Sequence, residues 1–371
     1  MNQNDWSVFC DRLKTAGELI SNQDAPQDAL TQAEGYRYLT RLLRAGLESS
    51  VEGSDPRFPV FYSLSHDTIK IGNDNPDNYY LNCCISGEYD YLIEGEFGEV
   101  EYFSVATKAG SYATTGDMRP TGEITSDSLK KNKDGSFSIT VSAKKPISSN
   151  ANWLPLSPES DNLIVRQYCN ARKERPAQFR IKCLNAGNAP ILNPAEFSQK
   201  LLRAVSFVEG TSGLFNSWIN QFKAHTNQLP ANDQDACIKV GGNEKIHYHN
   251  SHWSLAHDEA LLVTPERIPN CEAWNFQISN YWLESLDYRY NTISYNNISA
   301  IADDNRNYTM VVSHQDPGEK YPNWLNTAGH DQGSMLFRWI DADEFPAINT
   351  QVVKFSELTK LSEPINTENG Q

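Results

Sequence analysis

The sequence of 371 residues has no apolar run that approaches the roughly 20 residues needed to span a bilayer. Basic residues are also few: the sequence has 32 Lys and Arg but 47 Asp and Glu, which gives a net charge of −15. Nucleic acids and anionic membranes attract clustered positive charge, so neither is expected as a partner. The N-terminus lacks the basic start and apolar stretch of a signal peptide. We therefore expect a cytoplasmic protein.

Cysteine is scarce, and the usual catalytic and cofactor motifs are missing. The seven cysteines form an odd set without a Cys-x-x-Cys pair, which favours buried thiols over disulfides or a zinc site. The chain also lacks the glycine-rich loops of nucleotide-binding proteins, the Gly-x-Ser-x-Gly elbow and the His-Glu-x-x-His helix. These absences argue against nucleotide cofactors and the common serine-hydrolase and zinc-protease mechanisms. We expect no cofactor.

What the sequence does contain is a series of short β-rich runs separated by Gly, Asn and Asp turns. Apolar and polar residues alternate almost ideally over residues 136–142, as in a strand with one buried face. Closely spaced strands with short turns favour antiparallel pairing. We expect a mainly β fold with added helices, built from two antiparallel β-sandwich or jelly-roll-like domains.

Helical patterns flank these strands. Trp6, Phe9 and Leu13 recur near helical spacing, and Asn193-Pro194 opens a second helical stretch. The predicted organisation is an N-terminal helical segment at 1–54, a first β domain at 55–190, a helical connector at 191–234, a second β domain at 235–362 and a flexible tail at 363–371.

The densest set of chemically useful side chains lies in residues 316–339, a turn-rich loop between two predicted strands. His330 is a candidate general acid or base, because its ordinary pKa lies near neutrality. Asp316 is a candidate partner, Arg338 a candidate anion holder, and Asn323 and Asn326 candidate oxyanion donors. The alternative is structural: turn residues satisfy the loop backbone, and Trp324 fills the core.

A second set of candidates would bind substrate. Alternation over residues 274–278 places Trp274 and Phe276 on one face and Asn275 and Gln277 on the other. The amide face would line a cleft, and the aromatic rings would hold a sugar or a flat apolar ligand. The full set of predicted binding residues is Trp324, Trp282, Asn275, Gln277, Tyr295, Asn297 and Arg166.

His247 and His249 provide a third possibility. Residues two apart on a strand face the same way, so both imidazoles would reach one metal ion, as in a cupin-like site. The glutamate expected three or four residues later is missing, since His252 and Trp253 occupy that region. Two exposed histidines on a strand are the alternative interpretation.

Several segments together resemble a known family. They include Gly35-Tyr36-Arg37-Tyr38-Leu39, Asn152-Trp153-Leu154 and Asn323-Trp324-Leu325-Asn326-Thr327. The chain resembles proteins with the domain of unknown function 1214 in the C-terminal part, preceded by a 1254-like N-terminal part. This resemblance implies β-sandwich or jelly-roll domains with added helices, and it implies no activity.

The sequence thus leaves several functions open. The leading hypothesis is an acid–base enzyme of hydrolase or lyase type that acts on a small organic or glycan-like substrate in a cleft lined by residues 316–339. The alternatives are a non-catalytic module that binds a glycan or hydrophobic ligand or serves in assembly, and a cupin-like metal enzyme. A homo-oligomer is compatible with each hypothesis. The substrate, the reaction type and the oligomeric state do not follow from the sequence.

Overall fold

The computed structural model describes residues 3–22, 24–100, 102–111, 115–148, 151–169, 174–188 and 191–360. The chain divides into two compact units. Unit 1 comprises residues 1–218 and 233–243, and unit 2 comprises residues 219–232 and 244–371. The predicted tail at 363–371 lies outside the described residues.

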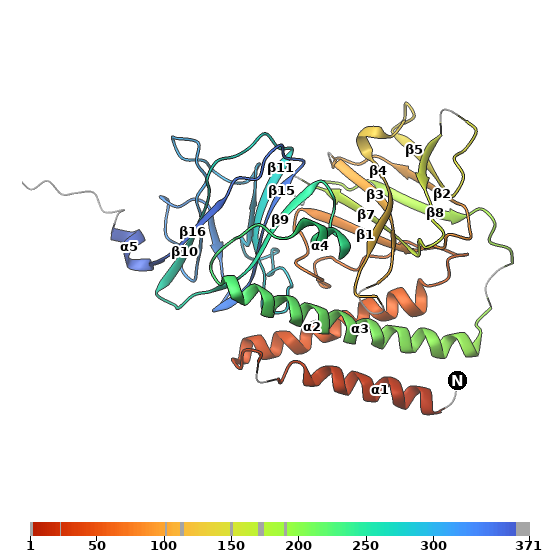
Figure 1. The fold of residues 1–371 in the computed structure, drawn as a ribbon, viewed down its shortest axis with the longest axis horizontal. Helices are drawn as coiled ribbons and strands as arrows, with labels where there is room; N and C mark the ends of the chain where they lie inside the picture. Colours follow the sequence, from red (N-terminus) through yellow and green to blue (C-terminus); the bar gives the residue numbers. More distant parts are fainter. Residues whose placement is uncertain are drawn as a thin grey trace, which may run out of the picture. The chain divides into compact units, whose positions relative to one another are not determined.

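Unit 1 begins with two helices, α1 (Gln3–Glu18) and α2 (Ala29–Leu47), which a one-turn π-helix (Glu48–Glu52) extends. The carboxylate of Asp28 accepts the Thr31 amide at 2.8 Å and so caps α2. The long helix α3 (Pro194–Phe222) packs beside them through Phe9, Leu201 and Val205, and Figure 1 shows the three helices side by side.

Eight strands of unit 1 form two four-stranded sheets, in the orders β1-β7-β3-β4 and β6-β5-β2-β8. The strands are β1 (Asn78–Cys84), β2 (Tyr91–Glu96), β3 (Tyr102–Ala109), β4 (Arg119–Thr125), β5 (Ser136–Ser142), β6 (Asn152–Pro155), β7 (Asn162–Tyr168) and β8 (Gln178–Cys183). Both sheets contribute to one apolar core, in which the rings of Phe103 and Phe137 stack 5.5 Å apart. Short helices complete the unit: η2 (Ser126–Ser128) and α4 (Gln234–Lys239).

Unit 2 contains eight further strands in two sheets, in the orders β12-β11-β15-β9 and β14-β13-β10-β16. The strands are β9 (Ile246–Ser254), β10 (Glu259–Pro265), β11 (Ala273–Ile278), β12 (Ser294–Asn296), β13 (Met310–Ser313), β14 (Trp324–Asn326), β15 (Gln332–Ile340) and β16 (Ile348–Lys354). Leu261 and Val312 of one sheet pack with Trp274 and Phe337 of the other, so the apolar core lies between the sheets. The turn η3 (Lys223–His225) and the helix α5 (Phe355–Lys360) flank this sandwich.

The two units repeat one strand plan. Numbering the strands of each unit from one to eight gives the same sheet orders, with partners 1-7-3-4 and 6-5-2-8 in both. In both units the fifth and sixth strands are parallel, and the other paired strands are antiparallel. Backbone bonds also correspond, because Ile85 donates to Asp161 and Leu255 donates to Asp331, at the same point of the first and seventh strands. The chain therefore contains two copies of one β architecture.

The mainly β fold class with added helices is confirmed. The strand expected at 136–142 is β5 (Ser136–Ser142). One difference concerns residues 316–339, where the short strand β14 interrupts the expected loop. Three residues of alternating burial are too short a signal to distinguish from a turn in the sequence.

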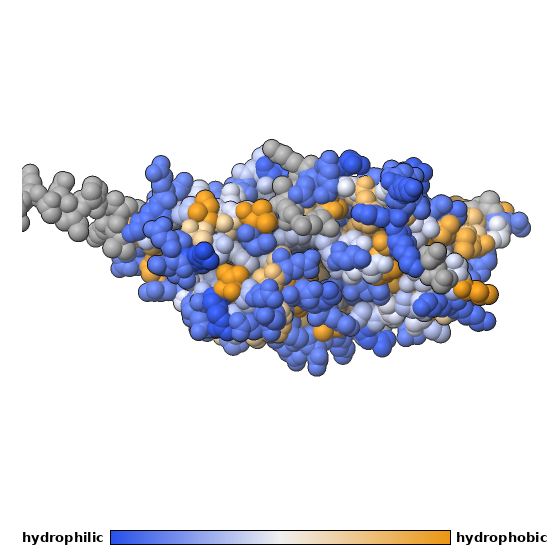
Figure 2. All heavy atoms as spheres, turned by 90° about the horizontal axis from the view of Figure 1, so that it is seen from above, coloured by the Kyte–Doolittle hydropathy of each residue, from blue (hydrophilic) through white to orange (hydrophobic). Residues whose placement is uncertain are grey.

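The surface carries few gathered apolar groups on the face that Figure 2 shows, where hydrophobic residues are scattered among hydrophilic ones. Such scattered residues are normal for a globular protein. Among the described residues, no helix combines the length and the apolar character required to cross a membrane.

Candidate functional site

Two of the predicted site residues belong to a structural motif that occurs once in each unit. The amide of Asn323 donates to the carbonyls of Ile301 and Thr309, and its oxygen accepts the Ile301 amide. Asn152 makes the same three kinds of contact with Lys130 and Ser138. The equivalence explains why an Asn-Trp-Leu sequence appears twice: the asparagine fastens the short sixth strand to its neighbours.

The tryptophan of this motif is also equivalent in the two units. Trp324 Nε1 donates to the carbonyl of Ser313, and Trp153 Nε1 donates to the carbonyl of Ser142, both at 3.1 Å. Each indole N–H thus donates to the carbonyl of the last residue in the fifth strand of its unit. The contacts of Asn323 and Trp324 favour the structural alternative that the sequence left open.

Asp316 and Asn326 shape the turns of the same segment. Asp316 is exposed, and its carboxylate accepts the Gly318 amide at 2.8 Å. Asn326 accepts the Ala328 amide at 2.8 Å and donates to Asn291 at 3.3 Å. These are the backbone-satisfying roles that Asp and Asn adopt in turns.

His330 is buried at the end of a tight turn. Its backbone amide donates to the Thr327 carbonyl at 3.1 Å, and its Nδ1 lies 2.8 Å from the same oxygen. Ala328 and Gly329 both have positive φ, at 51° and 85°, as a type I′ turn requires. Because Nδ1 is held by a carbonyl, it carries the proton, which fixes the tautomer of the ring.

Arg338 lies on β15 at the buried polar face of its sheet. Its Nη1 donates to Asn275 at 3.1 Å and to Gln277 at 2.6 Å. Register explains the contact, since Arg338 pairs with Asn275 across β11 and β15 and the two side chains share one face. The structure therefore brings Arg338 of the predicted 316–339 loop together with Asn275 and Gln277 of the predicted 274–278 strand.

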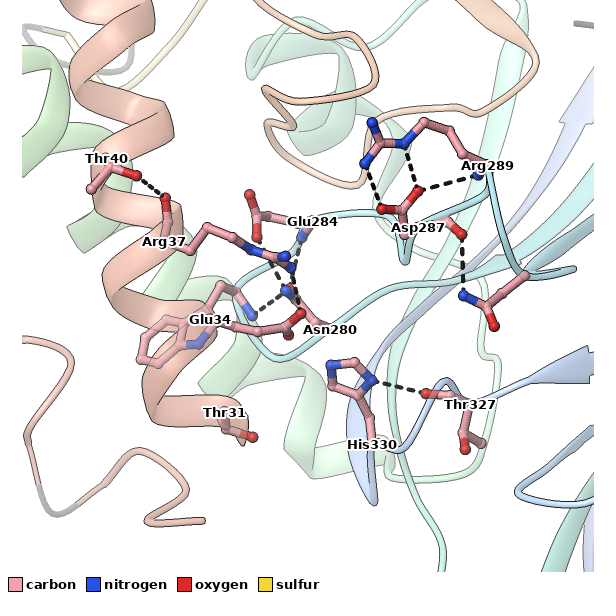
Figure 3. A network of polar contacts seen from close by, with 12 residues as sticks. Thr31, Glu34, Arg37, Thr40, Asn280, Glu284, Asp287, Arg289, Thr327 and His330 are labelled. Atoms are coloured by element: carbon pink, nitrogen blue, oxygen red, sulfur yellow. Dashed lines mark hydrogen bonds and ion pairs between the residues drawn. The ribbon is translucent and has the colours of Figure 1, made fainter. Parts of the chain in front are cut away.

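A loop that follows β11 adds a buried carboxylate to this region. Glu284 is 1% exposed, and it accepts the Asn280 amide side chain at 3.1 Å. Backbone hydrogen bonds between Ser279, Asn280 and Ser334 fasten the loop to the start of β15. In Figure 3 the ring of His330 points toward the loop that carries Asn280 and Glu284. No sequence signal marked Glu284, because a lone glutamate in a loop is normally solvated.

The predicted aromatic platforms are largely engaged within the fold. Trp282 is buried and packs edge-on against Tyr281. The hydroxyl of Tyr295 donates to the carbonyls of Pro322 and Trp324, and burial, with the Asp316 charge, raises its pKa. Asn297 is half-buried, and its backbone amide donates to Trp274.

His247 and His249 lie on β9 and face the apolar core rather than an acid. The ring of His247 stacks on Phe345 at 3.9 Å, and the two imidazole centroids are 5.2 Å apart. His249 Nδ1 contacts the Leu229 carbonyl at 3.1 Å. Burial lowers the pKa of both rings, to about 4 for His247, so both are neutral at physiological pH.

Arg166 lies on β7 and belongs to unit 1, whereas the other predicted binding residues belong to unit 2. Its Nη2 donates to the Gly241 carbonyl at 2.8 Å. Its Nη1 is buried without a hydrogen-bond partner among the described residues. The half-buried guanidinium is thus fixed at one end and unsatisfied at the other.

A further group that the sequence did not suggest consists of His257, His314 and Asp331. Their ligand atoms all lie within 4.8 Å of one another. Within the described part of the chain they are the three-residue set that meets the geometry of a metal site. They are separated by 57 and 17 positions in the sequence, so only the fold reveals the cluster.

Comparison with known proteins places the chain among relatives without an assigned activity. The family model described as "Protein of unknown function (DUF1214)" matches residues 85–171, within the first β unit rather than the C-terminal part where we expected it. The match does not cover the 1254-like segment expected at the N-terminus. No curated protein matches the chain.

Two solved structures are similar. The VPA0106 protein from Vibrio parahaemolyticus has a TM-score of 0.51 at 13% identity, covering 92% of this chain and all of its own, and shows the fold alone. An uncharacterised protein from Burkholderia cenocepacia is 43% identical, with a TM-score of 0.91 over 95% of this chain and 97% of its own. This chain therefore belongs to the same family as the Burkholderia protein, and its residues 85–171 match the domain of unknown function DUF1214.

Proposed function

We propose that the chain is an acid–base enzyme of hydrolase or lyase type that acts on a small organic anion at the polar face of β11 and β15. The observation that carries this proposal is the burial of three ionisable side chains in unit 2. Arg338, Glu284 and His330 are each 6% exposed or less. Burying ionisable groups is costly, so their presence inside one unit favours a chemical role.

Arg338 is the anion-binding group in this proposal. Its guanidinium is oriented by the amide oxygens of Asn275 and Gln277. A planar fork held in this way recognises a carboxylate, sulfate or phosphate group. The same two amides were the candidate substrate ligands on β11.

His330 and Glu284 would transfer protons to and from the substrate. With Nδ1–H donated to the Thr327 carbonyl, Nε2 is the basic nitrogen. Glu284 replaces Asp316 as the acid of the pair, because Asp316 is exposed and committed to the Gly318 turn. A carboxyl group and an imidazole in one site can divide general acid–base work between them.

Turnover of a substrate panel tests the proposal. The panel contains esters, glycosides and β-hydroxy acids, each with a carboxylate and as an uncharged analogue. We expect turnover of the anionic members, a rise in KM for Arg338→Met, and a fall in kcat of about 100-fold or more for His330→Asn.

Arg289→Gln is the matched control, because Arg289 belongs to unit 2 but forms an ion pair with Asp287. Full activity in folded His330→Asn would overturn the assignment. Binding of the anions without turnover by the wild-type protein would favour the alternative of a non-catalytic binding module.

Three broader expectations also belong to this proposal. The N-terminal segment is 1254-like, the protein is cytoplasmic, and it forms a homo-oligomer. The resemblance of the sequence supports the first expectation, and the charge and the free cysteines support the second. Light scattering after size exclusion tests the oligomer, and a mass corresponding to one chain would contradict it.

A further inference from the structure

Three strand ends of unit 2 place His257, His314 and Asp331 next to one another. His257 lies in the turn between β9 and β10, where the Glu259 amide donates to the Ala256 carbonyl. His314 directly follows β13, and Asp331 directly precedes β15. The turn at His257 links the two sheets of the sandwich, so residues from both sheets meet at this end.

His314 is held in one orientation by the fold. Its Nδ1 lies 3.0 Å from the hydroxyl of Thr327, a residue with no exposed surface. When Nδ1–H donates to this hydroxyl, Nε2 carries the lone pair that a metal ion requires. A second residue that fixes the ligand ring in this way is a regular feature of metal-binding histidines.

The other nitrogen of His314 is directed at the cluster but lacks a hydrogen bond. The side chain is 7% exposed, and Nε2 is buried without a hydrogen-bond partner among the described residues. Asp331 Oδ1 lies 3.6 Å away, beyond hydrogen-bond distance. A buried, unsatisfied nitrogen is costly, so its persistence calls for a ligand.

Unit 1 provides an internal comparison. The hydrogen bond from Ile85 to Asp161 in unit 1 corresponds to the bond from Leu255 to Asp331 in unit 2. Residue 85 therefore aligns with residue 255, which makes Gly87 the counterpart of His257. The hydroxyls of Ser142 and Ser313 each bond the carbonyl two residues later, so Ala143 is the counterpart of His314. The same strand plan thus forms with one acid and no histidine at this end. The fold itself does not need the two imidazoles.

We propose that His257, His314 and Asp331 bind a divalent transition-metal ion such as Zn²⁺, Co²⁺ or Ni²⁺. Two imidazoles and one carboxylate are borderline ligands that suit these ions rather than Ca²⁺ or Mg²⁺. Three protein ligands leave further coordination positions for water or a small anion. The three ligands are not residues of the proposed acid–base site, although Thr327 contacts both His314 and His330. The proposal does not depend on the proposed function.

The distances fit such an ion after a small adjustment. Asp331 Oδ1 is 3.6 Å from His314 Nε2 and 3.8 Å from His257 Nε2. Two atoms that bind one tetrahedral ion at about 2.1 Å are about 3.4 Å apart. All three ligand atoms lie within 4.8 Å of one another, and the side chains of His257 and Asp331 are 81% and 58% exposed, so they are free to move toward an ion.

Titration of the chelator-treated full-length protein with Co²⁺ and Zn²⁺ tests the proposal. We expect calorimetry to show one ion per chain and Co²⁺ to develop the visible absorption of a site with nitrogen and oxygen ligands. His314→Ala, Asp331→Asn and His257→Ala should each weaken binding by about tenfold or more. His257 is exposed in a turn, so its variant tests the site even where His314→Ala folds poorly.

His225→Ala and Asp304→Asn are the matched controls, because each removes an exposed residue of the same type from unit 2. They should bind Co²⁺ as the wild type does. Failure of the wild type to bind one ion would overturn the proposal. So would undiminished binding in His257→Ala, or a loss of binding in His247→Ala instead.

Discussion

Asn323 illustrates how one polar side chain supports a chemical and a structural interpretation until its partners are known. In the sequence it stands in a loop beside His330, and amide donors in such loops stabilise oxyanions in many enzymes. In the structure its amide satisfies three backbone groups of unit 2. The repeated Asn152 does the same in unit 1, which connects the residue type with strand docking.

We expect Asn323→Ala to destabilise the protein by about 2–4 kcal/mol, because it leaves partly buried backbone groups of Ile301 and Thr309 unpaired. Asn152→Ala is the matched variant. It should destabilise the protein less than Asn323→Ala does, because the contacts of Asn152 are solvent-exposed. Urea unfolding measures the free energy of unfolding of both variants. Equal stability of wild type and Asn323→Ala would contradict the structural role.

The pH dependence of stability should reflect buried His252. Burial lowers its pKa to about 4 from the ordinary 6.5. Between these values the unfolded chain binds a proton that the folded chain does not, so stability falls as pH falls through this window. The full loss from His252 amounts to about 3 kcal/mol.

Urea unfolding at about pH 7.5 and about pH 4.5 measures this loss. In His252→Asn the difference between the two pH values should shrink. It should not vanish, because the pKa of His247 is also lowered to about 4. A variant with the wild-type pH difference would show that His252 does not contribute.

At the scale of elements, the start of β15 depends on a glycine. A Cβ at Gly333 would lie 2.1 Å from the Ser279 carbonyl oxygen, in the loop that leads to Glu284. The close backbone approach allows Ser279 to donate to Ser334 at 2.8 Å. Strand and loop are therefore joined by main-chain contacts that tolerate no side chain between them.

Gly333→Ala should destabilise the protein by about 3 kcal/mol, because it forces the loop away from β15. Gly213→Ala is the control of opposite sign. It lies inside α3 with no atom within 4 Å of an added Cβ, so alanine should stabilise by about 0.5–1 kcal/mol. Thermal unfolding of both variants provides the measurement, and equal shifts would contradict the steric argument.

At the scale of the whole molecule, two cores are built on one strand plan. The repeat explains why Asn-Trp-Leu occurs twice, whereas the histidine cluster belongs to unit 2. The strand order and the docking asparagine are common to both units. The side chains at the strand ends differ, and such ends are where function is added to a shared scaffold.

Two cores predict two separable contributions to unfolding. Phe103→Ala removes a buried ring from the core of unit 1, and Phe337→Ala removes one from unit 2. Each substitution should lower the free energy of unfolding by about 3–5 kcal/mol. Calorimetry should show that each variant lowers a different part of the transition. One sharp transition that both variants shift equally would contradict this picture.

The sequence predicted the elements well where periodicity was strong. Residues 136–142 alternate over a full strand, and Trp6, Phe9 and Leu13 recur near helical spacing in α1, so local signals sufficed. The short strand β14 was not predicted, because three residues are too few to show a periodic pattern. Arg338, Asn275 and Gln277 were all chosen from the sequence, but their mutual contact required the β11–β15 register.

The sequence by itself determined the mainly β class, the scarcity of positive charge and the pool of polar side chains. The tertiary structure alone decided which of them meet. Strand pairing is non-local, so the distance between His257 and His314 in space bears no relation to the 57 positions between them. Burial likewise follows from packing, and it separates the turn residue Asp316 from the enclosed carboxylate of Glu284.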